Sequence, residues 1–136
     1  MAANPIADSS FLVALLTDRD RDHVWAVTQA ALHRRPWKTC EATASEAFYM
    51  LGTPGTEALI SLIRRGGVDC SFNFAAHSDD VLRLMTRYSN VPMAFGDACL
   101  VRMTEILSDP ILLTTDSDFR IYRRHGRQVV PCVMPR

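Results

Sequence analysis

The sequence predicts an α/β fold with three layers, in which a mostly parallel central sheet carries helices on both faces. Short β-like apolar runs alternate along the chain with longer segments of helical periodicity. This alternation is the pattern of a parallel sheet whose strands are connected by helices. The length of 136 residues is typical of one domain, so we expect residues 1–136 to form a single domain.

Strands are expected where apolar residues follow one another without helical spacing. The clearest case is Ile111-Leu112-Leu113-Thr114, which is typical of a strand buried on both faces. The full set of expected strands lies near residues 6–8, 38–40, 69–72, 111–114 and 129–133.

Proline, glycine and capping residues indicate several helix boundaries. Pro54 suits the first turn of a helix, Gly66-Gly67 suits a helix stop, and Ser78-Asp79-Asp80 suits an N-terminal cap. The expected helices lie near residues 10–16, 22–34, 43–51, 54–65, 79–88, 97–107 and 118–125.

The composition excludes several classes of protein. Hydrophobic residues make up 48% of the chain and charged residues 22%, which is typical of a globular protein, and no apolar stretch reaches membrane-spanning length. The N-terminal residues lack the features of a signal peptide, so a cytoplasmic protein is expected. The net charge is zero, so the overall field does not indicate a polyanionic partner. The four cysteines and four histidines are dispersed without zinc-ligand spacing.

Four acidic residues lie beside or inside apolar segments, namely Asp8, Glu46, Asp97 and Asp116. A carboxylate taken out of water must be paired, hydrogen-bonded, bound to a metal or protonated. Glu46 stands out because helical spacing places it on one face with Tyr49 and Met50. We therefore expect Glu46 to point with the apolar residues. For the other three acids, capping of a helix N-terminus is the alternative explanation.

The predicted topology brings these acids to one place. Residues at the carboxyl ends of parallel strands gather in one crevice; Asp8 and Asp116 follow such ends, and Glu46 and Asp97 begin helices near the same rim. Carboxylate oxygens are the hard ligands that Mg²⁺ prefers. The sequence therefore predicts an oxygen-rich metal site built from remote residues.

Five segments, taken together, resemble the PIN-domain ribonucleases of the VapC toxin type, which belong to bacterial toxin–antitoxin pairs. They are IADSSFLVALL (6–16), DRDHVWA (20–26), TASEA (43–47), YSNVPMAFGDACLV (88–101) and TTDSDFRIYRR (114–124). The resemblance covers nearly the whole chain and implies a single PIN-like domain. It departs from the family at Ala94, where relatives usually carry Ser or Asp, and at Gly96, where they often carry Ala.

The resemblance implies that the four acids hold Mg²⁺ or Mn²⁺ for hydrolysis of RNA phosphodiester bonds. We interpret Asp8 and Asp97 as direct ligands, Asp116 as an outer or second-metal ligand, and Glu46 as the residue that orients water. Thr114 or Thr115 matches the family's hydroxyl residue, and Asp118 matches an additional acid. The resemblance also implies an antitoxin partner and a homodimer.

An arginine cluster follows Asp116, and Arg120, Arg123 and Arg124 are candidates for contacts with RNA phosphates. The alternative is a solvated face. Two other functions stay open: a catalytically silent PIN-like module that binds RNA or protein, and a haloacid-dehalogenase-like phosphotransferase. The second is disfavoured because Ser10 replaces its second early acid and Lys38 is the only lysine.

Overall fold

The computed structural model describes residues 2–136 and contains one five-stranded sheet in the order β3-β2-β1-β4-β7. Its strands are β1 (Asn4–Ala7), β2 (Trp37–Lys38), β3 (Val68–Asp69), β4 (Pro110–Leu113) and β7 (Cys132–Val133). Every pairing in this sheet is parallel, which confirms the predicted fold class.

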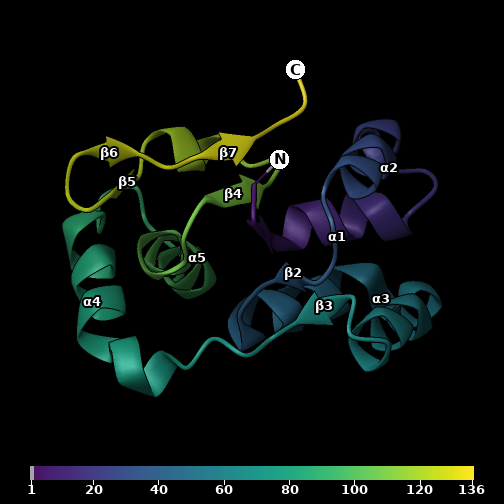
Figure 1. Cartoon of the computed structure of the whole chain (residues 1–136), viewed down its shortest axis with the longest axis horizontal. Coiled ribbons are helices and arrows are strands. Elements are labelled where there is room, and N and C mark those ends of the chain that lie inside the picture. Colours follow the sequence, from purple (N-terminus) through teal and green to yellow (C-terminus); the bar gives the residue numbers. More distant parts are fainter. Residues whose placement is uncertain (1) are drawn as a thin grey trace.

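Helices pack on both faces of the sheet, so successive buried residues of its central strands join different clusters (Figure 1). The helices are α1 (Ser9–Leu16), α2 (His23–Leu32), α3 (Glu41–Arg64), α4 (Phe74–Arg87) and α5 (Phe95–Ile106). Ile6 and Leu112 join a buried cluster formed with α4 and α5, whereas Ala7 and Leu113 join a cluster formed with α1, α2 and α3. Successive strand residues therefore contribute to opposite layers.

The two helices expected at 43–51 and 54–65 are confirmed as the two halves of α3, which meet at a kink. The kink is at Gly52, whose φ of 63° and ψ of −168° lie outside the helical region. These angles are accessible almost only to glycine. Thr56 Oγ1 donates a hydrogen bond to the Gly52 carbonyl at 2.7 Å. The kink sets the direction of the second half of α3.

Replacement of Gly52 by alanine is expected to destabilise the fold. A Cβ at φ 63° is strained, and this strain costs about 1–3 kcal/mol of unfolding free energy, measurable by urea denaturation. The matched control is Thr53→Ala at the exposed neighbouring position, where a change within about 0.5 kcal/mol is expected. Equal stability of Gly52→Ala and the wild type would contradict the kink geometry.

The helix predicted at 79–88 matches the part of α4 that follows a break at His77, where φ is −127°. The helical turn from Phe74 to this break was not predicted. The extent of one other helix was wrong. The helix predicted at 118–125 is only the 3₁₀ turn η1 (Ser117–Arg120). A hairpin of β5 (Arg123–Arg124) and β6 (Gln128–Val129) follows it.

The strand predicted at 129–133 is split between two elements. Val129 belongs to β6 of the hairpin, and only Cys132 and Val133 join the five-stranded sheet, as β7. His125 and Gly126 adopt positive φ values of 50° and 80° in the hairpin loop, which is incompatible with a continuing helix. Within residues 2–136, no helix combines the length and the apolar character that crossing a membrane requires.

Candidate functional site: an acidic pocket between β1 and β4

An acidic pocket of about 360 Å³ lies at the carboxyl ends of the central strands. The chain adds β2 and β3 on one side of β1 and then returns to add β4 on the other side. Ligands of parallel α/β folds usually bind at such a reversal of strand order. The pocket is lined by Asp8, Ser9, Ser10, Glu46, Met50, Pro92, Ala94, Asp97, Asp116 and Asp118. The structure thus brings together the four predicted acids and Asp118.

Asp8 is the most buried acid of the pocket and the most heavily hydrogen-bonded. The residue is 4% exposed. Oδ1 accepts from Ser9 N at 2.7 Å, and Oδ2 accepts from Thr114 Oγ1 at 2.6 Å and from Ser10 Oγ at 2.9 Å. Burial raises the pKa of Asp8, and these three hydrogen bonds oppose that rise. Asp8 also caps α1, so capping and a pocket position coexist at this residue.

Asp97 is held in the first turn of α5, beside the other acids. Burial, followed by the charges of Asp8, Asp116 and Glu46, raises its pKa to about 7. Tyr122 Oη donates a hydrogen bond to Asp97 Oδ2 at 3.4 Å. The effect of the Asp8, Asp116 and Glu46 charges on the pKa of Asp97 indicates that the four carboxylates share one site.

Glu46 differs from its prediction in one respect. It does lie on one face of α3 with Tyr49 and Met50, but that face is exposed, with Tyr49 88% accessible. Glu46 therefore points with Tyr49 and Met50 as expected, but this face is not part of the core, and the core side of α3 is formed by residues such as Ala47. Glu46 reaches the pocket at its open side, where Ser9 Oγ donates a short hydrogen bond to its Oε1.

A threonine joins Asp8 to Asp116 across the sheet. The fully buried Thr114 hydroxyl donates to Asp8 and accepts a hydrogen bond from Asp116 N at 2.9 Å. Thr115 contributes its backbone N–H, which donates to Ser10 Oγ at 2.9 Å. Of the two threonines that the sequence offered, Thr114 is the one whose hydroxyl contacts Asp8. Asp116 itself caps η1 through Asp118 N.

The arginines that follow Asp116 have different surroundings. Arg123 Nη1 donates to the carbonyl of Arg120 at 2.7 Å, and Arg124 Nη2 donates to the carbonyl of Thr104 at 2.5 Å. These contacts hold the turn and the hairpin against α5. Arg120 is exposed, so its guanidinium is the most available of the three predicted phosphate contacts.

The donor set of the pocket suits a hard cation, because all of its charged groups are carboxylates. No three histidine, cysteine, aspartate or glutamate side chains within residues 2–136 are arranged to hold a metal ion together. Magnesium commonly takes only one or two protein carboxylates and completes its shell with water and substrate phosphate. The residues therefore fit Mg²⁺ or Mn²⁺ as a partly hydrated ion.

Three pocket contacts were missed by reasoning from sequence. Ser9 and Ser10 could have been found, because hydroxyl residues directly after a buried aspartate are near enough to bond it. Tyr122 carries no such signal, since it lies 25 positions from Asp97 in sequence and its fully buried side chain meets Asp97 only in the folded chain.

Ala94, one of the two departures from the family pattern, lines the pocket without offering a polar group. Gly96, the other departure, lies against α3, where a Cβ would come within 3.3 Å of Thr43 Oγ1.

The parallel sheet and its two helical layers form a three-layer PIN-like fold, with the acidic pocket at the strand-order reversal. The chain is similar in structure to VapC20 of Mycobacterium tuberculosis, a toxin that cleaves the sarcin–ricin loop, with a TM-score of 0.67 and 20% sequence identity. The match covers 85% of this chain and 92% of VapC20. At this identity the likeness shows the VapC-type PIN fold. No protein-family model matches the sequence, and no curated protein matches it.

Proposed function

We propose that this protein is a metal-dependent endoribonuclease and the toxin of a type II toxin–antitoxin pair. One observation carries the proposal: four carboxylates from elements remote in sequence line a single pocket in a VapC-type fold. Keeping these acids together is costly, as the raised pKa values of Asp8 and Asp97 indicate. A bound cation offsets that cost and gives the arrangement a function.

The side chains divide the work according to their surroundings. Asp8, fixed by Thr114, Ser10 and Ser9, offers an oriented carboxylate at the base of the pocket. Because the pKa of Asp97 is raised to about 7, a proton competes with a cation for this carboxylate near neutral pH. We assign direct metal contacts to these two residues.

The remaining acids occupy the rim of the pocket. We assign Glu46 to orienting the water that attacks a scissile phosphate, and Asp116 to an outer or second-metal ligand; both residues line the pocket. When bound, Mg²⁺ or Mn²⁺ supplies charge neutralisation at the phosphoryl oxygens and lowers the pKa of coordinated water.

The same reasoning extends to partners. We propose that the toxin cleaves an RNA substrate, is bound by an antitoxin and forms a homodimer. The proposed location is the cytoplasm. The phosphotransferase alternative loses support, because Lys38, the only lysine, donates a short hydrogen bond to Asn4 Oδ1 and is not among the residues that line the acidic pocket.

A cation-dependence experiment tests the proposal. Purified protein is incubated with a structured RNA in EDTA, and then with Mg²⁺ or Mn²⁺ in excess. Cleavage is expected to stop in EDTA and to return with either ion, because the pocket's carboxylates repel the substrate until a cation binds. Cleavage that persists in EDTA would reject the metal mechanism, and RNA retention without cleavage in saturating Mn²⁺ would favour the silent binding module.

A further inference from the structure

Four exposed arginines lie on the two neighbouring loops that lead into β2 and β3, at the end of these strands opposite the acidic pocket. Arg34 and Arg35 follow α2, whereas Arg64 ends α3 and Arg65 follows it. The two loops are held together by the hydrogen bond from Trp37 N to the Gly67 carbonyl at 2.9 Å. The Arg35 side chain packs so closely on Gly67 that a Cβ there would lie 3.1 Å from Arg35 Cδ. We call these four arginines the basic edge.

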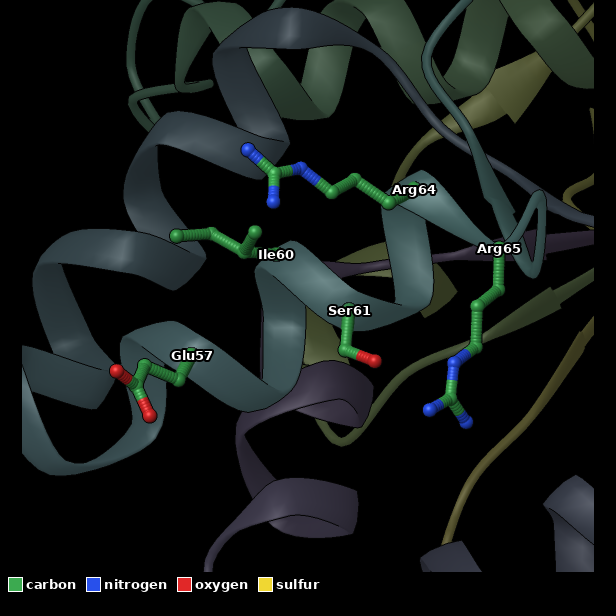
Figure 2. Close-up of a pocket in the computed structure, with 5 residues that line it drawn as sticks. All are labelled: Glu57, Ile60, Ser61, Arg64 and Arg65. Carbon is green, nitrogen blue, oxygen red and sulfur yellow. The ribbon is translucent and has the colours of Figure 1, made fainter.

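The basic edge has no acidic partner within ion-pair distance. The ion pairs of residues 2–136 involve Arg21, His23 and Arg102, and none of the basic-edge arginines. Arg64 and Arg65 line a surface pocket of about 440 Å³ with Glu57, Ile60 and Ser61. Figure 2 shows the two arginine side chains leaving the helix end in different directions, with the Glu57 carboxylate pointing away from both.

Helix dipoles explain only part of this charge. Helices α2 and α3 both end at these two loops, and each carboxyl terminus carries roughly half a negative charge. Four guanidinium groups exceed the two half-charges by about three units. A surplus of unpaired arginine is the usual electrostatic basis for binding a phosphate backbone.

The position of the edge also fits a nuclease that must hold a polyanion beside an acidic pocket. Thr39 Oγ1 donates to the Ala7 carbonyl at 2.8 Å, so the end of β2 lies next to Asp8. The five residue-to-residue steps from Arg35 to Cys40 span at most ~16 Å at about 3.3 Å each. A stacked strand advances about 3.4 Å per nucleotide, so roughly five nucleotides cover that distance.

We propose that the basic edge, made of Arg34, Arg35, Arg64 and Arg65, binds RNA phosphates some five nucleotides from the scissile bond. The inference rests on the proposed endoribonuclease function and adds a substrate class to it. The preferred substrate is an RNA long enough to reach both the acidic pocket and the basic edge. Phosphate contacts of this kind position the strand and do not read its bases.

Binding measurements without cleavage test the basic edge. Fluorescence anisotropy in EDTA is recorded with a labelled RNA hairpin for Arg64→Gln/Arg65→Gln and for Arg34→Gln/Arg35→Gln. Each double variant is expected to bind at least ~10-fold more weakly. The slope of log affinity against log salt is expected to fall by about 1.4, from about 0.7 for each lost phosphate contact.

The control is Arg19→Gln/Arg21→Gln, which also removes two exposed positive charges. It is expected to bind RNA like the wild type. Wild-type affinity and salt slope in both basic-edge variants would overturn the inference. These unchanged RNA-binding values are also what we would expect if the basic edge bound an acidic protein and not RNA. Thermal melts show whether each variant is folded. If one of the two basic-edge variants is unfolded, the RNA affinity of the other variant tests the inference.

Cleavage assays separate this inference from the proposed function. With Mn²⁺, the basic-edge variants are expected to cut a tetranucleotide at the wild-type rate and the hairpin more slowly at sub-saturating concentrations. If the basic-edge variants cut both the tetranucleotide and the hairpin at the wild-type rate, the result would count against the basic edge and leave the proposed nuclease function in place. Absence of any cutting by the wild type would reject the nuclease, and the anisotropy data would still decide whether this edge binds RNA.

Discussion

Asp97→Asn is expected to abolish RNA cleavage while making the metal-free protein more stable at pH 8. The variant removes a proposed metal ligand, and loss of several kcal/mol of transition-state stabilisation corresponds to a rate at least ~1000-fold lower. It also removes a carboxylate whose charge is disfavoured by burial and by Asp8, Asp116 and Glu46. An inactive variant that is more stable than the wild type cannot owe its inactivity to unfolding.

The sign of the pH dependence follows from the raised pKa of Asp97. The folded protein binds this proton more tightly than the unfolded chain does, with a pKa of about 7 against the ordinary 3.8. The associated stability is fully present below pH 4 and is lost as the pH rises through 7. Relative to the wild type, Asp97→Asn should therefore gain on the order of 2 kcal/mol at pH 8, after allowance for solvent screening, and little at pH 4.

Urea denaturation at the two pH values, with and without Mn²⁺, measures these effects. Mn²⁺ is expected to stabilise the wild type at pH 8 by mass action and to have a smaller effect on Asp97→Asn. Asp79→Asn is the matched control, because Asp79 is exposed on α4 and is not a pocket residue. Undiminished cleavage by Asp97→Asn would remove this residue from the proposed site.

Thr114→Val is expected to lower both stability and activity. Valine keeps the shape of threonine but leaves Asp8 Oδ2 without its 2.6 Å donor and Asp116 N without its acceptor. The loss of a buried hydrogen bond to a charged group costs about 2–3 kcal/mol. Because Thr114 orients a proposed ligand and does not bind the metal itself, cleavage is expected to fall about 10- to 100-fold.

Thr114→Ser distinguishes the hydroxyl from the methyl group. Serine keeps the hydrogen bonds and loses one buried methyl, worth about 1 kcal/mol, so its cleavage rate should stay close to that of the wild type. Unfolding free energies and single-turnover cleavage rates are compared for the three proteins. If Thr114→Val matched the wild type in both, Thr114 would have no positioning role for Asp8.

The sequence by itself determined the fold class and the acids that meet in the pocket. Both depend on local pattern: the run at Ile111–Leu113 predicts a buried strand whatever lies beside it, and Asp8 and Asp116 follow strand ends in any parallel arrangement. The free-energy cost of removing a carboxylate from water was also informative, since an acid beside an apolar run needs a partner.

Only the tertiary structure decided which groups serve these acids. Thr114 contacts Asp8 across 106 positions of sequence, and Tyr122 reaches Asp97 across 25. It also placed Glu46 on an exposed face and gave Arg123 and Arg124 carbonyl partners. The physical reason is that side-chain burial and hydrogen-bond partners depend on which elements pack together, and local periodicity carries no information about that choice.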